Sequence, residues 1–329
     1  MTETAPFRWQ DGERLIVFGR GTLAQGDGLL GTGYTLLSTE RAAAGAPGIV
    51  AGAESVHEIG PGRVDELAAD LRPRVDGKLL VALGGGRVID VAKAVAAADP
   101  PRRVAALPTT LSGAEMTSIH RHAAGVPADT PRVRPAIVLN DPGLSASQPV
   151  PELAASALNA LGHAFEGPLT PLSNPVAALA ALDAARMIAA GFAPRKPDRD
   201  ALALGALLAG YVIGSTGYGL HHVLSQTLVR FAAVGHGPAN AIMLPHSTGA
   251  LKRRFPDALA RLATALGEDP GPVAARLCEL TGTMRLAELG VTEEQLDRCA
   301  DEASARPELH LTPPAADRAE LRRLYASAY

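Results

Sequence analysis

Two histidines and a glutamine in the second half of the chain have a spacing that could serve chemistry. His222 and His236 are fourteen residues apart in HHVLSQTLVRFAAVGH, and Gln226 follows His222 after about one helical turn. An imidazole can ligate a metal, transfer a proton near neutral pH, or lie in a buried core with its hydrogen bonds satisfied. The stretch is therefore a metal site, a catalytic site that lacks one member, or a buried helical face.

A run of glycines in the first half of the chain could bind a phosphate. Gly84, Gly85 and Gly86 lie between an apolar stretch and a helical pattern in LLVALGGGRVIDVAKAVA. Without Cβ atoms the backbone can turn sharply and bring N–H groups against a pyrophosphate, and the start of the next helix adds partial positive charge. A simple tight turn is the alternative, and the spacing differs from the G-x-G-x-x-G pattern of an ordinary Rossmann domain.

Polar residues after the glycine run extend the predicted phosphate site. Arg87 stands at the helix start, where it either binds a phosphate or an acidic substrate or points into solvent, and Asp90 follows one turn later. Thr109, Thr110 and Ser112 follow the next apolar stretch, at the sheet edge where ligands usually bind. Any one hydroxyl could cap a helix, but three beside the glycines favour a ligand contact.

The elements that must position these residues change character near residue 148. The first part alternates short apolar runs with helical patterns at 62–75 and 88–98, which is typical of a parallel sheet covered on both faces. The expected strands are 14–19, 34–39, 48–52, 78–86, 103–110 and 135–141.

The second part is helical in period throughout. Asn174 followed by Pro175 marks one helix start, and Thr292 with Gln295 forms a capping box at another. We therefore predict an α/β nucleotide-binding domain over 1–148 and an all-α domain over 149–329, with a ligand cleft at their junction. The expected helical regions are 151–167, 174–192, 201–230, 241–267 and 271–282.

Composition excludes several classes of partner. The 329 residues are 47% hydrophobic but only 4% aromatic, so the core is built from Ala, Leu and Val, and a net charge of −3 gives no basic stripe for nucleic acid. Cys278 and Cys299 lack metal-type spacing, which suits a reducing cytoplasm. Residues 201–220 are apolar enough to suggest a membrane span, but their five glycines favour a buried helix, and we expect no membrane.

Several motifs together resemble the iron-containing alcohol dehydrogenase and dehydroquinate synthase-like superfamily, and the resemblance covers nearly the whole chain. Within it, PTTLSGAEMT, the asparagine in LNALGHA and the C-terminal region look like the maleylacetate reductase branch. The motifs, in the superfamily's order, are FGRGTL (18–23), GGGRVIDVAK (84–93), PTTLSGAEMT (108–117), NDPGL (140–144), NALGHAFEG (159–167), GLHH (219–222) and HGPANAIMLPH (236–246).

The resemblance implies a reduced nicotinamide cofactor lying across the turn Gly84–Gly86, with its nicotinamide end near the three hydroxyl residues. NADH and NADPH both stay open, because Ser38 and Thr39 end the second expected strand where an acidic residue would select NAD, and Glu40 is beside them. The resemblance also implies a small-molecule substrate that enters from the helical domain, and a homodimer.

In metal-dependent relatives the ligands are an aspartate, a histidine four residues later, and two histidines fourteen apart. The matching positions are Asn159, His163, His222 and His236. The amide of Asn159 leaves the site one negative charge short, so we expect no functional iron or zinc, although three imidazoles could still hold zinc. Many relatives have a histidine at the position of Gln226, which can hydrogen-bond but cannot act as an acid near neutral pH.

The leading interpretation is an NAD(P)H-dependent, metal-independent reductase of a small carboxylated enone or keto acid. His163, His222 and His236, with Gln226, form its expected catalytic set, because hydride transfer leaves negative charge on oxygen that an imidazolium stabilises or protonates. One alternative is a metal-dependent alcohol or aldehyde dehydrogenase that tolerates Asn159. Another is a diverged member of a specialised biosynthetic pathway that binds nucleotide but carries out altered or non-redox chemistry. Buried histidines with no function are the remaining possibility.

Overall fold

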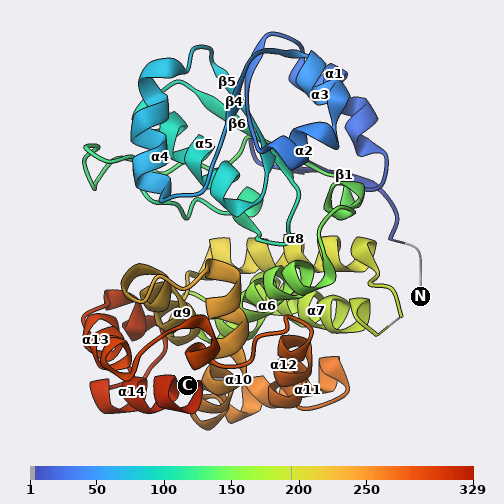
Figure 1. The fold of residues 1–329 in the computed structure, drawn as a ribbon. Helices are drawn as coiled ribbons and strands as arrows, with labels where there is room; N and C mark the ends of the chain where they lie inside the picture. Colours follow the sequence, from blue (N-terminus) through green and yellow to red (C-terminus); the bar gives the residue numbers. More distant parts are fainter. Residues whose placement is uncertain (1–3, 194) are drawn as a thin grey trace. The chain divides into compact units, whose positions relative to one another are not determined.

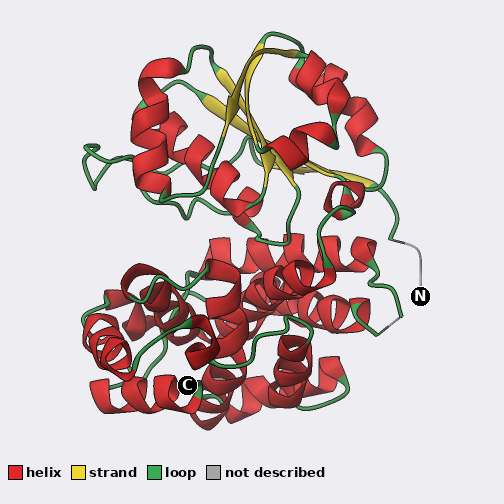
Figure 2. Cartoon of the chain, in the orientation of Figure 1, coloured by secondary structure: helices red, strands yellow, loops and turns green. Residues whose placement is uncertain are grey.

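The protein is represented by a computed structural model that describes residues 4–193 and 195–329. The chain divides into two compact units, Met1–Gln148 and Pro149–Tyr329 (Figure 1). Figure 2 shows the strands in the first unit, whereas the described residues of the second unit form helices and loops. The predicted order of an α/β part followed by an all-helical part is confirmed.

The first unit is built on a sheet of seven strands in the order β1-β2-β7-β6-β5-β3-β4. The antiparallel pair β1 and β2 forms one end of the sheet, and the other pairings are parallel. The predicted parallel sheet is thus present, with an additional edge strand, β1. The strands are β1 Phe7–Asp11, β2 Arg14–Phe18, β3 Tyr34–Ser38, β4 Ala53–Glu58, β5 Leu79–Gly84, β6 Arg103–Pro108 and β7 Ile137–Asn140.

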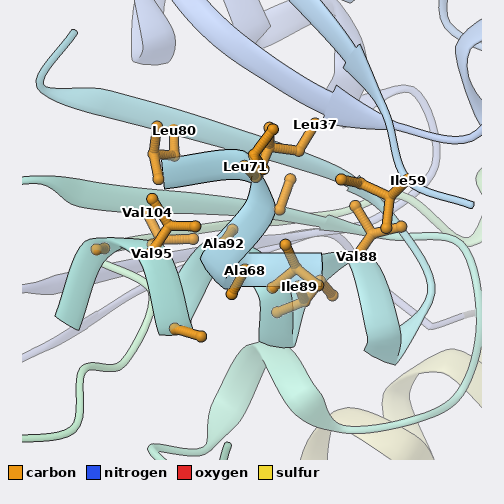
Figure 3. Close-up of a cluster of buried hydrophobic side chains, with 14 of the residues drawn as sticks. Leu37, Ile59, Ala68, Leu71, Leu80, Val88, Ile89, Ala92, Val95 and Val104 are labelled. Carbon is orange, nitrogen blue, oxygen red and sulfur yellow. The ribbon is translucent and has the colours of Figure 1, made fainter. Parts of the chain in front are cut away.

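Helices cover both faces of this sheet, because successive side chains of a strand point to opposite faces. Leu80 and Ala82 of β5 pack with the helices of one face, and Val81 and Leu83 pack with those of the other. Figure 3 shows the first cluster, in which Leu80 lies among side chains of the covering helices. The first face carries α4 Val64–Leu71 and α5 Gly86–Ala98, and the second carries α1 Gly26–Leu30, α2 Glu40–Ala44 and α3 Pro47–Ala51.

The prediction of a strand at 48–52 is wrong. This stretch forms the helix α3, and the neighbouring residues Ala53–Glu58 form the strand β4 instead. Pro47 stands in the first turn of α3, where its fixed φ angle favours a helix start, and a short apolar run does not by itself distinguish a helix from a strand. Burial alternates along β4, as expected for a half-exposed edge strand rather than a central one.

The second unit consists of nine α-helices over its described residues. The predicted starts are confirmed, since the Asn174 side chain accepts a hydrogen bond from the N–H of Ala177 and Thr292 with Gln295 forms the reciprocal capping box. The helices are α6 Val150–Glu166, α7 Pro175–Gly191, α8 Arg199–Thr216, α9 Leu220–Phe231, α10 His236–Arg254, α11 Pro256–Leu266, α12 Pro270–Glu279, α13 Glu293–Ser304 and α14 Arg318–Ser327.

Short 3-10 helices connect the larger elements of both units. They are η1 Thr22–Gln25, η2 Arg72–Arg74, η3 Ala114–Met116, η4 Pro142–Ser145, η5 Gly167–Leu169, η6 Leu286–Leu289 and η7 Pro307–Leu311.

The apolar region 201–230 forms two helices, α8 and α9, rather than one. Gly217 ends α8 with a φ of 67°, a value that favours glycine, and the two helix axes are bent by 98°. Among the described residues, no single helix is both long and apolar enough to cross a membrane, and α8 and α9 meet that criterion only as a bent pair. Leu202, Ala209 and Val212 of α8 are fully buried within the protein.

Helices α6 and α9 approach each other closely at Gly162. A Cβ atom at this position would lie 2.6 Å from both Nε2 and Cδ2 of His221 on α9, a distance that real Cβ contacts do not show. The glycine is therefore needed for the ring of His221 to lie against α6.

We expect Gly162→Ala to lower the free energy of unfolding by about 1–3 kcal/mol, because overpacking forces the two helices apart. Urea denaturation measures the change. Gly249→Ala in α10 is the matched control, since a Cβ there would come no closer than 3.9 Å to Arg253; it should stabilise the protein by about 0.5–1 kcal/mol. Equal stability of Gly162→Ala and the wild type would show that α6 and α9 are not in close contact.

Candidate functional site

The glycine turn lies at the point of the sheet where nucleotides commonly bind. The chain passes from β3 to β4 on one side and then returns to β5 on the other side of β3. Ligands of open α/β sheets bind at the carboxyl ends of such a pair of strands. Ser38 pairs with Leu83, and Gly84 pairs with Pro108, so Thr39, the glycine run and Thr109 follow neighbouring strand ends at one edge of the sheet.

Two of the three glycines lie against predicted hydroxyl residues. Gly85 is the N-cap of the thirteen-residue helix α5 and has no side chain with which to cap it. A Cβ at Gly85 would lie 3.0 Å from the nearest atom of Thr110, and one at Gly86 would lie 3.0 Å from Ser112. The start of α5 and two hydroxyl groups therefore come together, an arrangement suited to an anion such as a pyrophosphate.

The other predicted cofactor residues have the following contacts. Arg87 is exposed in the first turn of α5, and Asp90 pairs with Lys93 at 2.7 Å between Oδ1 and Nζ. Thr39 is the N-cap of α2, and its hydroxyl accepts a hydrogen bond from the N–H of Ala42. Thr109 is buried, and its N–H donates to the carbonyl oxygen of Gly84 at 3.0 Å.

Lys93 is a buried residue to which the sequence analysis assigns no role. Its ammonium group donates to the carbonyl oxygens of Ala114 and Ile119, both at 2.9 Å, and of Thr117 at 3.2 Å. These bonds hold the segment that follows Ser112 against α5. A single lysine within the apolar face of the helix is the sequence signal that could have revealed it.

In the second unit, α6 and α9 bring His163 and His222 into contact. Their ring centroids are 4.7 Å apart and the rings are inclined by only 23°, so the two imidazoles stack. His221, which the sequence analysis did not select, lies edge-on to His222 at 4.7 Å between centroids. Nδ1 of His221 is 2.9 Å from the hydroxyl of Ser247 on α10. All three rings are buried.

His236 and Asn159 complete the predicted group of four. His236 is the exposed first residue of α10, and its Nε2 lies 3.2 Å from Oδ1 of the buried Asn159 on α6. Asn159 precedes His163 by four residues and therefore shares its helix face. All four predicted positions thus lie in the same region of the second unit.

Glu166, the last residue of α6, is a fully buried carboxylate that the sequence analysis did not select. Oε1 lies 2.8 Å from Nδ1 of His222, and Oε2 accepts a hydrogen bond of 2.6 Å from the backbone N–H of His221. Burial raises the pKa of Glu166, and His221 together with the backbone N–H groups at the start of α9 opposes that effect. A glutamate one turn after His163, in an otherwise apolar helix end, was the available signal.

Burial also determines the charge of the imidazoles. It lowers the pKa of His163 well below its ordinary value and that of His221 to about 3, and the neighbouring imidazoles act in the same direction. The buried rings are therefore neutral near pH 7, which corrects the expectation of a resident imidazolium. A neutral imidazole still donates through one nitrogen and accepts through the other.

The four predicted positions offer a divalent metal ion a weaker set of ligands than one that includes a carboxylate. Among the described side chains, no three or more of His, Cys, Asp or Glu are grouped so as to hold one. The oxygen of Asn159 faces Nε2 of His236, and the nearby carboxylate of Glu166 already contacts His221 and His222. The four positions thus offer neutral donors only, whereas divalent ions favour anionic ligands.

Gln226 belongs to a hydrogen-bonded network with the C-terminal part of the chain. Its Oε1 accepts a hydrogen bond of 3.1 Å from Nη2 of Arg306, which also lies 3.2 Å from the hydroxyl of Tyr218. Arg306 forms a two-fold ion pair with Glu308, at 3.0 Å and 2.9 Å. The ring of Tyr218 lies 5.9 Å from that of His222, so this network adjoins the imidazoles. Gln226 therefore acts as a hydrogen-bonding residue fixed by Arg306.

The solved structures that resemble this chain have the same fold. A putative alcohol dehydrogenase from Ralstonia eutropha JMP134 has a TM-score of 0.86 at 30% identity, covering 98% of this chain and 97% of that chain. Maleylacetate reductase from Rhizobium sp. strain MTP-10005 has a TM-score of 0.82 at 27% identity, covering 99% of this chain and 98% of that chain. The predicted fold class is thereby confirmed.

Sequence comparisons agree with the structural ones. The family model for the C-terminal region of the Fe-containing alcohol dehydrogenase family matches residues 153–329. Maleylacetate reductase 1 of Rhodococcus opacus is 33% identical over 82% of this chain and 78% of its own length. Maleylacetate reductase 2 of Cupriavidus pinatubonensis is 36% identical over 80% of this chain and 76% of its own length. The chain therefore belongs to the Fe-containing alcohol dehydrogenase family, as its motifs indicated.

Proposed function

We propose that this protein is an NAD(P)H-dependent reductase of a small carboxylated enone or keto acid, and that it works without a metal ion. Relatives named maleylacetate reductase, 32–36% identical over most of the chain, support a reductase of this kind. The observation that carries the metal-free form of the proposal is the neutral donor set, with Asn159 against His236 and His163 stacked on His222.

The first unit binds the cofactor in this proposal. The start of α5, capped by no side chain at Gly85, receives the pyrophosphate, and Thr110 and Ser112 lie beside it. Ser38 and Thr39 at the end of β3 carry no charge that would repel a 2′-phosphate, so the proposal includes both NADH and NADPH. When bound, the reduced nicotinamide supplies the hydride.

The second unit binds the substrate. Hydride addition to an electrophilic carbon leaves negative charge on the substrate's oxygen, and an imidazole N–H directed at that oxygen stabilises it. Burial of His163 excludes water, which strengthens such a hydrogen bond. His236, which is exposed, adds one polar contact for the substrate. Gln226, which accepts a hydrogen bond from Arg306, adds another.

The proposed setting is a reducing cytoplasm. Cys278 and Cys299 are both free and buried, and burial raises the pKa of each thiol to about 11. Such thiols are inert and do not depend on an oxidising compartment.

The direct test is oxidation of NADH or NADPH by the purified protein with maleylacetate and related keto and enone acids, followed by absorbance. We expect turnover that added chelator does not reduce. His222→Ala should lower kcat by about 10²- to 10⁴-fold while leaving cofactor affinity unchanged. His246→Ala is the matched control, since His246 contacts Ser327 and not the imidazole group. Wild-type turnover in His222→Ala would remove this residue from the mechanism.

We expect Gly85→Asp to abolish NADH and NADPH binding, measured by calorimetry. The new side chain would press against Thr110 and place negative charge where the pyrophosphate binds. Gly48→Asp in α3 adds the same side chain to the same unit at a position with no atom within 4 Å of the added Cβ, and it should bind the cofactor normally. Normal binding by Gly85→Asp would place the cofactor elsewhere.

Asn159→Asp should raise the affinity for zinc or iron(II), because it restores a carboxylate beside the imidazoles. Metal content after dialysis, measured by mass spectrometry, reports the change. Asn174→Asp, at the N-cap of α7, adds the same charge away from the imidazoles and should bind no additional metal. Equal metal content in the two variants would mean that residue 159 does not share a site with the histidines.

A further inference from the structure

Glu166 is a buried charged group that the proposed reaction leaves without a role. Building on the proposed function, we propose that Glu166 is a positioning residue. It fixes the ring of His222 through Nδ1–H and so presents the unprotonated Nε2 of His222 to the substrate as a hydrogen-bond acceptor. The juxtaposition that supports this is one carboxylate with one oxygen on the helix that carries His222 and the other on the ring itself.

The first contact fixes the helix. The first N–H groups of an α-helix have no partner within the helix, and Gly219, the N-cap of α9, has no side chain to satisfy them. Oε2 of Glu166 accepts the N–H of His221 at 2.6 Å, and a carboxylate at a helix N-terminus is also favoured by the helix dipole. Glu166 therefore fixes the first turn of α9 against the end of α6.

The second contact fixes the ring. Oε1 lies 2.8 Å from Nδ1 of His222, and a carboxylate bonded to one imidazole nitrogen sets the orientation of the whole ring. Nε2 is then the nitrogen left for another partner. It is buried, and no group among the described residues hydrogen-bonds to it. The ring also stacks on His163, which restricts its rotation further.

The neighbouring His221 shows that this arrangement is specific to His222. Nδ1 of His221 contacts the Ser247 hydroxyl, and its Nε2 lies against α6, 2.6 Å from where a Cβ of Gly162 would be. Its ring is therefore enclosed by protein on both sides. Of the two adjacent histidines, only His222 combines a carboxylate on one nitrogen with the stacked partner His163.

Thr312 provides a matched comparison. Its hydroxyl accepts the N–H of Leu220 at 2.9 Å, so it also caps the first turn of α9, and it is buried. Unlike those of Glu166, this hydrogen bond of Thr312 is with the helix backbone and not with an imidazole. Loss of Thr312 tests the helix contact alone, and loss of Glu166 tests the helix and ring contacts together.

The experiment compares Glu166→Ala, Glu166→Gln and Thr312→Val with the wild type by kcat, KM and cofactor affinity. We expect Glu166→Ala to lower kcat on the order of 10- to 100-fold, with cofactor affinity unchanged. Glu166→Gln should keep the contact with α9, because its amide oxygen accepts from His221. Its kcat should stay as low as that of Glu166→Ala, because its amide N–H₂ donates to Nδ1 of His222 and moves the ring proton to Nε2. Thr312→Val should keep the wild-type kcat.

Imidazole ¹⁵N NMR of the same proteins gives a readout that needs no turnover. In the wild type we expect Nδ1 of His222 to carry the proton, and in Glu166→Gln we expect Nε2 to carry it, while His246 is unchanged. This pattern supports the proposal even if the wild type reduces none of the acids tested, an outcome that would overturn the proposed function alone.

Three results would overturn the positioning role. The first is identical His222 signals in the wild type and Glu166→Gln, which also decides the matter if Glu166→Ala fails to fold. The second is a wild-type kcat in Glu166→Gln, in which Nε2 of His222 donates instead of accepting. The third is a loss of kcat in Thr312→Val as large as that in Glu166→Ala. Such a result would mean that the loss comes from the helix contact and not from the ring contact.

Discussion

The contact between α6 and α9 is the constraint on which the imidazole group depends. Gly162 lets the ring of His221 lie against α6, and one turn later Glu166 accepts hydrogen bonds from α9. A carboxylate buried without partners would cost several kcal/mol, so this packing is stable only because both oxygens are hydrogen-bonded. The same bonds that offset desolvation also orient His222, and folding and ring placement are therefore inseparable at this point.

The first unit also contains a buried charged group whose hydrogen bonds are satisfied, but its charge is positive. Lys93 is buried in α5, and its ammonium group is satisfied by three carbonyl oxygens and by Asp90. Three of these partners belong to the segment that follows Ser112, beside the glycine turn. In both units a buried, fully bonded charge thus fixes the backbone next to the proposed ligand position, and such networks rigidify what they connect.

Regular, periodic elements could be predicted from the sequence, and irregular ones could not. The central strands and the long helices follow from their hydrophobic periods, whereas β1, a polar edge strand, has no such signal. The strand predicted at 48–52 was wrong because five apolar and glycine residues are compatible with both helix and strand. The capping residues Asn174 and Thr292 were predictable because the chemistry of a cap is local.

The same distinction holds for the candidate site. Asn159 and His163 share a helix face, so their proximity follows from the sequence. Glu166 is 56 residues from His222, and Arg306 is 80 residues from Gln226, so these contacts depend on tertiary packing that no local pattern encodes. The neutral state of the imidazoles also required the structure, because it follows from burial rather than from residue type.

Charge links the residue at position 159 to the proposed substrate. Hydride transfer places negative charge on an acid that already carries carboxylates, and a resident carboxylate beside His236 would repel both unless a cation compensated it. Asn159 removes that repulsion while its amide still hydrogen-bonds at 3.2 Å. In the proposed function, the neutral amide at position 159 therefore adds no second negative charge to a group of residues that already contains Glu166. In the proposed function, the amide of Asn159 that makes the four positions weaker metal ligands also suits them to a carboxylated substrate.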